Sequence, residues 1–195
     1  MFNRREQSQR RALQKAAAKS LATLAKGTGW RVSQGVLFRE WEGLFIVARF
    51  YIKLLEGKTV AELEAKPLDL DPIFWDVMDL AENRRQSLSF RYFGVFVCPM
   101  ATVAEEPLDE GGGDPNLIAL NLLSWANQHL PTVKALVTPY TDYLVKHPNP
   151  SGHYRAGLIT SLLLDGNTTE LTTYVPPRSG IIAILGFRRS SVIAN

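Results

Sequence analysis

The sequence predicts an α+β fold, with an N-terminal helix, an antiparallel meander of about three strands covered by helices, and a helical C-terminal half. A leucine and alanine stripe with helical spacing occupies the first 25 residues. Two runs rich in Val, Ile, Phe and Tyr follow it, and beyond residue 116 the leucines return at helical spacing. With 195 residues and a hydrophobic fraction of 46%, the chain is long and apolar enough to fold around its own core.

The first helix is expected over residues 4–25, because alanine and long unbranched side chains favour a helix. Glycines at positions 27 and 29 end it. One side of this helix is apolar: Leu13, Ala17, Leu21 and Leu24. That side is expected to pack on the rest of the domain.

Residues 30–40 and 43–55 are predicted to form two strands joined by a tight turn. Alternate residues of the second strand are all apolar from Leu44 to Leu54, so this face is expected to cover the core. A third long strand is predicted over residues 87–98, and Pro99 ends it.

Two helices are predicted between the second and third strands. Thr59 and Glu62 have the spacing of a capping box, which predicts a short helix closed by Pro67. The second helix is expected over residues 72–82, with Asp71 as its N-cap. Its buried side chains are expected to be Phe74, Trp75, Met78 and Val77.

An acidic, glycine-rich loop over residues 104–116 divides the chain into residues 1–103, with the sheet, and residues 117–195, with the helices. Both parts are expected to pack as one domain. Helices are predicted over 117–130, 131–146, 152–164 and 167–175. The tail over residues 178–195 receives no assignment.

Basic side chains concentrate at the N-terminus, where residues 1–31 hold eight of them against one acid, Glu6. One interpretation is that the first helix packs beside an acidic surface of its own domain. Another is an arm that binds nucleic acid or anionic lipid through Arg4, Arg5, Arg10 and Arg11. A mitochondrial transit peptide also has an Arg-rich, acid-poor composition. Since the chain has one cysteine and no run of about 20 apolar residues, we predict a cytoplasmic protein that does not cross a membrane.

Two arginines interrupt apolar strands and are the candidate ligand-binding residues. Arg49 lies beside Tyr51 on the second strand, and Arg91 lies beside Phe93 on the third. If these strands pair, the two guanidinium groups share a face that suits a carboxylate, a phosphate or an acidic partner. The alternative is that each arginine is solvated or pairs with a nearby acid.

No catalytic residue, metal site or cofactor is predicted. The histidines at 129, 147 and 153 lack the spacing of zinc ligands, and the sequence contains no nucleophile elbow, Walker loop or dinucleotide fingerprint. The leading hypothesis is a non-enzymatic module that binds another protein or a second copy of itself, of which an inhibitor or immunity protein is one form. The alternatives are nucleic-acid binding through the first helix and binding or turnover of a small anion at the strand arginines.

Overall fold

The computed structural model describes residues 4–53, 58–137, 140–146, 152–167 and 169–170. The chain forms two compact units, each built from two stretches of sequence. Unit 1 comprises Met1–Pro67 and Met100–Val137, and unit 2 comprises Leu68–Pro99 and Thr138–Asn195. The predicted α+β class is confirmed.

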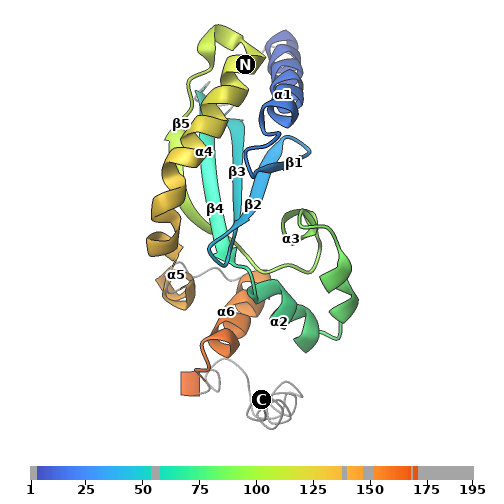
Figure 1. The fold of residues 1–195 in the computed structure, drawn as a ribbon, viewed down its shortest axis with the longest axis vertical. Coiled ribbons are helices and arrows are strands. Elements are labelled where there is room, and N and C mark those ends of the chain that lie inside the picture. Colours follow the sequence, from blue (N-terminus) through green and yellow to red (C-terminus); the bar gives the residue numbers. More distant parts are fainter. Residues whose placement is uncertain (1–3, 54–57, 138–139, 147–151, 168, 171–195) are drawn as a thin grey trace. The chain divides into compact units, whose positions relative to one another are not determined.

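Unit 1 contains an antiparallel sheet of five strands in sequence order, where about three were expected (Figure 1). The strands are β1 (Arg31–Ser33), β2 (Val36–Trp41), β3 (Leu44–Lys53), β4 (Lys58–Pro67) and β5 (Ala101–Pro107). Each strand pairs with its neighbour in the sequence, so the sheet is a meander. The predicted hairpin around Glu42 and Gly43 is the β2–β3 turn, and both residues have positive φ.

The single strand expected over residues 30–40 is interrupted by a second tight turn. Gln34 and Gly35 have φ values of 51° and 79°, and they connect β1 to β2. A Cβ on Gly35 would lie 2.8 Å from the Cβ of Ala18 on the first helix. Glycine therefore serves both the turn and the close approach of the hairpin to that helix.

The helix predicted from Thr59 to Pro67 is wrong, because these residues form β4. Its helix-favouring composition is overridden by pairing along the whole length of β3, from Lys53–Lys58 to Leu44–Pro67. The alternation also has a period of two. One face has the apolar residues Ala61, Leu63 and Ala65, and the other has Val60, Glu62, Glu64 and Lys66.

The acidic loop predicted over residues 104–116 is partly wrong, because its first residues belong to β5. The rest carries a short 3₁₀ turn, η2 (Gly111–Gly113). Two helices were expected between residues 117 and 146 with a break at Pro131. The structure has one long helix, α4 (Pro115–Val137), which continues through Pro131, and a short α5 (Tyr140–Lys146) in unit 2.

The first helix, α1 (Arg4–Leu24), is confirmed, and it packs against α4 (Figure 1). Ala17 and Leu21 of α1 are fully buried. α4 covers the face of the sheet that the alternation in β3 predicts, since Leu44, Ile46, Ala48 and Phe50 are all buried. Phe45 and Val47, on the opposite face of β3, are buried as well.

Trp30 ties three parts of unit 1 together. Its ring is 4% exposed, and its indole N–H donates to Oδ1 of Asn127 on α4 at 2.9 Å. The guanidinium of Arg39 on β2 lies 5.4 Å from the centre of the ring. The start of β1 is thereby fixed against both the sheet and α4.

Unit 2 is helical. Its elements are α2 (Leu70–Val77), η1 (Ala81–Arg85), α3 (Phe90–Phe93), α5 and α6 (Gly152–Leu164). α6 packs against α2 and α5. The helix predicted over residues 72–82 is confirmed with an earlier start, because Asp69 and not Asp71 is its N-cap residue. Phe74 and Trp75 are buried as expected, but Met78 is exposed.

The third long strand predicted over residues 87–98 is wrong. The chain forms α3 and then bends before it enters β5. The apolar alternation over these residues does not separate a buried face from an exposed one, because Phe96 is 48% exposed while the next two residues, Val97 and Cys98, are both buried. Most of the helix predicted over residues 167–175, and all of the tail over 178–195, lie outside the described residues. None of the described helices is both long and apolar enough to cross a membrane.

Candidate functional site

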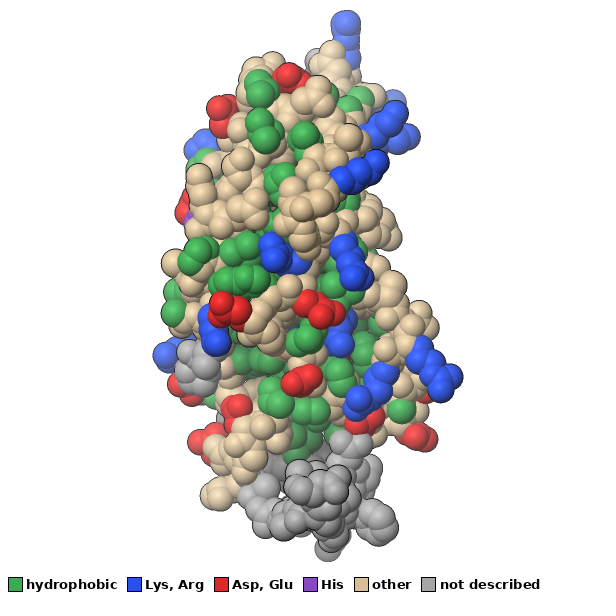
Figure 2. Space-filling view, viewed as in Figure 1, with side chains coloured by type: hydrophobic (Ala, Val, Ile, Leu, Met, Phe, Trp, Pro, Cys, Tyr) green, Lys and Arg blue, Asp and Glu red, His purple; other side chains and the backbone are tan. Residues whose placement is uncertain are grey.

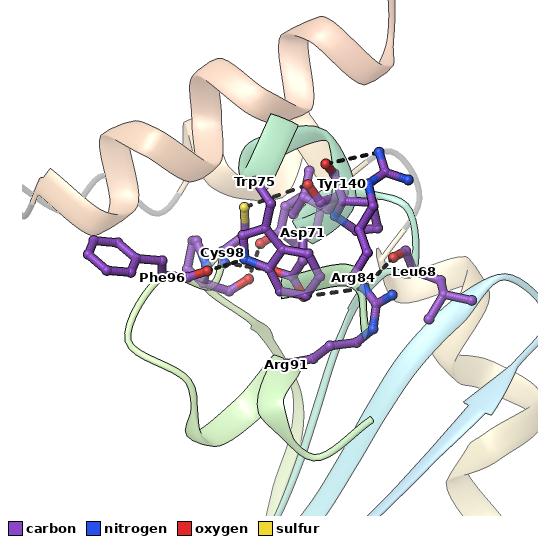
Figure 3. Close-up of polar contacts among 11 residues, drawn as sticks. Leu68, Asp71, Trp75, Arg84, Arg91, Phe96, Cys98 and Tyr140 are labelled. Atoms are coloured by element: carbon purple, nitrogen blue, oxygen red, sulfur yellow. Dashed lines mark hydrogen bonds and ion pairs between the residues drawn. The ribbon is translucent and has the colours of Figure 1, made fainter. Parts of the chain in front are cut away.

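A buried carboxylate organises unit 2 (Figure 3). Asp71 has no exposed surface, and its Oδ1 accepts the backbone N–H of Cys98 at 2.7 Å. Its Oδ2 lies 3.5 Å from Nη1 of Arg91, which also donates to the carbonyl of Leu68 at 2.7 Å. Because a buried charge is stable only when it is paired and hydrogen-bonded, Asp71 holds α3 and the segment that follows it against α2.

Trp75 supplies a second attachment for the same segment. Its ring is 2% exposed, and the guanidinium of Arg91 lies 5.5 Å from the ring centre. The indole N–H donates a hydrogen bond to the carbonyl of Phe96. The chain after α3 is therefore attached to α2 at residue 96 and, through Asp71, at residue 98.

Pro99 ends this attached segment among residues of α5 and α6. The hydroxyl of Tyr140 donates to the carbonyl of Pro99. Burial, more than the nearby Cys98 and Asp71, raises the pKa of Tyr140 well above its ordinary value, so the hydroxyl remains a donor. A Cβ at Gly157 would lie 2.4 Å from Cδ of Pro99, so α6 approaches the proline as closely as glycine allows.

Between α3 and these attachments, the chain presents apolar side chains to solvent. The chain bends at Val95 and Phe96. Val95 is 82% exposed, Phe96 is 48% exposed and Phe93 is 38% exposed. Figure 3 shows the ring of Phe96 pointing away from Asp71 and Arg91. We call residues 93–96 the apolar loop.

Arg49, the first candidate ligand residue, lies on β3 in unit 1 and has acidic neighbours. Its Nη2 is 2.6 Å from Oε2 of Glu62, and its Nε is 3.5 Å from Oε2 of Glu64, both on the adjacent β4. The centre of the Tyr51 ring lies 5.6 Å from the guanidinium, so these two residues are neighbours as the sequence predicts. An anion at Arg49 has to compete with two carboxylates.

Arg91, the second candidate, lies on α3 in unit 2 and not on a strand. Its guanidinium is held by Asp71, Leu68 and the face of Trp75. The two arginines thus belong to different units, and each has an acidic partner within its own unit. A ligand shared by Arg49 and Arg91 stays a prediction.

The N-terminal arginines lie on α1. Arg4, Arg5 and Arg11 are exposed, whereas Arg10 is half-buried. Lys15 and Lys19 were counted among the eight basic side chains but were not named as candidate binding residues. They follow Arg11 on the same side of the helix at four-residue steps. That spacing is the signal that identifies them, because it separates one basic face from the total charge of the N-terminus.

A further polar cluster joins β5 to α4 in unit 1. Oε2 of Glu106 accepts the indole N–H of Trp125 at 2.9 Å, and its Oε1 lies 3.3 Å from Nε2 of His129. Nδ1 of His129 lies 2.9 Å from the carbonyl of Trp125. Since a carbonyl only accepts, Nδ1 is the donor there, and Nε2 donates to Glu106 only when the imidazole is protonated.

These contacts predict the titration of Glu106. The hydrogen bond from Trp125, followed in effect by His129, lowers the pKa of this carboxyl below its ordinary 4.5. A depressed pKa stabilises the fold above the pKa of the unfolded chain, and this contribution is lost as the pH falls through the pKa of the folded state. We expect W125F to raise the pKa of Glu106 towards 4.5, as measured by carboxyl NMR. W41F, which changes a tryptophan on β2, is the control, and an unchanged pKa in W125F contradicts the assignment.

Within the described part of the chain, no group of three or more His, Cys, Asp or Glu side chains is placed to hold a metal ion. Comparison of the chain with protein-family models, with curated proteins and with solved structures gave no match. The candidate sites therefore rest on their own geometry.

Proposed function

We propose that the protein is a non-enzymatic interaction module that holds a partner protein on the apolar loop of unit 2. The observation that carries this proposal is the exposure of Val95 and Phe96, at 82% and 48%, beside the partly exposed Phe93. Aromatic side chains are enriched at protein interfaces, where a few large apolar residues supply most of the binding energy. Apolar side chains that project together into solvent are typical of such anchors.

The attachment of the loop to α2 supports the same function. Hydrogen bonds from Trp75 to the Phe96 carbonyl and from the Cys98 N–H to Asp71 hold the chain directly beside the exposed residues. Binding then costs little backbone entropy, because the loop is ordered before the partner arrives. In this proposal Asp71 and Trp75 have a structural role. The exposed side chains of Val95 and Phe96 make the contact with the partner.

The chemistry of the loop also defines the partner. Val95 and Phe96 require an apolar pocket on the partner, since their burial provides the driving force. The partner is either a different protein or a second copy of this chain. The single cysteine, Cys98, fits the cytoplasmic location that we propose for this interaction.

The double variant V95D/F96D tests this function. It places two carboxylates where the partner is expected to provide an apolar pocket, so we expect recovery of the partner from an extract of its own cells to fall at least ~30-fold, the loss of about 2 kcal/mol that one hot-spot residue carries. Quantitative mass spectrometry of material bound to the immobilised protein measures this loss. Sedimentation velocity on the purified protein shows whether the partner is a second copy.

The matched control is L136D/V145D, which makes the same chemical change at two other apolar residues, 55% and 51% exposed. It is expected to recover the same proteins as the wild type. If V95D/F96D and the wild type recover the same proteins in equal amounts, and self-association is also unchanged, the apolar loop is not the binding surface.

A further inference from the structure

A basic groove lies along α1 in unit 1. Its volume is about 580 Å³, and one wall is α1 while the other is the β1–β2 hairpin. The lining residues are Arg11, Gln14, Lys15, Ala18, Lys19, Ala22, Val32, Gln34 and Gly35. The contact of Gly35 with Ala18 forms the floor, where the hairpin approaches the helix.

Three cations line this groove at regular intervals. Arg11, Lys15 and Lys19 are exposed and follow one another every four residues, so each step along α1 is about 6 Å. Among the described residues, no carboxylate lies within ion-pair distance of any of the three. Their charge is therefore available to an external anion.

The row of cations continues beyond the groove. Arg4 lies on the same side of α1 as Arg11, away from the buried Ala17 and Leu21. Figure 2 shows Lys and Arg side chains gathered along the edge where Figure 1 places α1. From Arg4 to Lys19 the row spans about 22 Å, which suits an extended chain of charges better than a single small anion.

The composition of the groove favours phosphates over a protein partner. Protein interfaces are enriched in aromatic residues and depleted in lysine and alanine, and this lining contains two of each of the latter and no aromatic residue. Nucleic acids, by contrast, are bound largely through lysine and arginine on the phosphates, with amide side chains as additional donors. Gln14 and Gln34 supply such amides here.

The shape of the groove limits which parts of a nucleic acid its residues can contact. The hairpin lies against α1 beside the basic row, so this side of the helix is part of a concave surface and does not project into a major groove. No aromatic ring lines the groove to stack with bases. Contacts to the sugar–phosphate backbone without base recognition are what these residues allow.

From these observations we propose that the α1 groove binds the phosphate backbone of single-stranded nucleic acid, without preference for sequence. The cations at 11, 15 and 19 each contact a phosphate, and Arg4 extends the contact along the strand. This site is independent of the apolar loop, so the protein joins a nucleic acid through unit 1 and a protein through unit 2.

The test measures the association constant K for a labelled oligothymidylate of about 20 nucleotides by fluorescence anisotropy, at salt concentrations from about 50 to about 200 mM. In R11Q/K15Q/K19Q, loss of three phosphate contacts is expected to make the negative slope of log K against log salt shallower by about 2, since each contact contributes about 0.7. The same loss weakens binding by ~100-fold at about 0.1 M salt. Circular dichroism checks that the variant is folded.

Two further variants separate this site from general charge. K58Q/R85Q/K146Q removes three exposed cations outside the groove and is expected to retain the wild-type slope. R11K/K15R/K19R keeps all three positive charges, and because the backbone contacts are electrostatic it is expected to bind within about twofold of the wild type.

Three results overturn the proposal. One is the absence of binding by the wild type at about 50 mM salt, since low salt favours phosphate contacts. Another is an equal loss in the two neutralised variants, which assigns the binding to net charge. The third is tighter binding of a labelled 20-residue polyglutamate than of the oligonucleotide, which assigns the groove to an acidic protein.

Discussion

Replacing Asp71 with alanine is expected to lower the free energy of unfolding by about 3–5 kcal/mol, the range for removing one partner of a buried charge pair. The carboxylate is fully buried, lies 3.5 Å from the guanidinium of Arg91 and accepts the backbone N–H of Cys98. The alanine variant leaves a largely buried guanidinium without this carboxylate and a buried N–H without this acceptor. Urea denaturation followed by circular dichroism measures the change.

D71N and D69A are the companion variants. D71N keeps an acceptor for Cys98 while it removes the charge, so its loss of stability is expected to be smaller than that of D71A. Asp69 is exposed at the start of the same helix and makes no side-chain capping hydrogen bond, so D69A is expected to change the stability by about 0.5 kcal/mol or less. Equal stabilities of D71A and D69A contradict the structural role of the buried carboxylate.

Replacing Trp30 with alanine is expected to cost about 3–5 kcal/mol, as is typical of removing a large buried aromatic side chain. The ring is 4% exposed, packs under Arg39 and donates its indole N–H to Asn127. In W30F most of the apolar burial remains, so only the hydrogen bond is lost and the expected cost is about 1 kcal/mol. Thermal and urea unfolding of the purified variants check both values.

A double-mutant cycle isolates the bond between Trp30 and Asn127. N127A and W30F remove the same hydrogen bond from opposite ends, so W30F/N127A is expected to be less destabilised than the sum of the two single variants. Strict additivity of the two losses contradicts the bond as the attachment of β1 to α4.

The elements with a strong local pattern were predictable from the sequence. The apolar stripe of α1 and the alternation in β3 identified both elements, because each pattern is repeated over many residues. The buried faces were identified in part, since Leu24 of the α1 stripe is 37% exposed and Phe45 and Val47 on the other face of β3 are buried as well. β4 was missed because its residues favour a helix locally. Its strand conformation comes from β3, a partner that a local pattern does not show.

The strand prediction for residues 87–98 was wrong for a different reason. The alternation of apolar residues there is that of a strand. In the structure, however, Arg91 forms an ion pair with Asp71, 20 positions earlier in the chain, and the carbonyl of Phe96 accepts a hydrogen bond from Trp75. Such contacts between residues that are distant in the sequence determine the backbone conformation here, and a local pattern does not show them. Sequence analysis selected Arg91 as an unusual arginine, and the structure explains it as the partner of a buried carboxylate.

The candidate sites likewise combine features that a local sequence pattern shows with features that depend on contacts between distant residues. The basic N-terminus was evident from composition, but the groove depends on the β1–β2 hairpin, whose approach to Ala18 has no local signal. The exposed pair Val95 and Phe96 was not identified from the sequence, because both residues were assigned to a strand that the structure does not have. Exposure depends on what the rest of the chain leaves uncovered.

The most direct test of the protein-binding function is photo-cross-linking from the apolar loop. A photoreactive phenylalanine analogue at position 96 is expected to give one discrete cross-linked species in an extract of the protein's own cells, at twice the chain mass if the partner is a second copy. The same analogue at Leu136, which is exposed to a similar degree, is expected not to give it. The account is contradicted if position 96 yields no cross-link, or if both positions yield the same products.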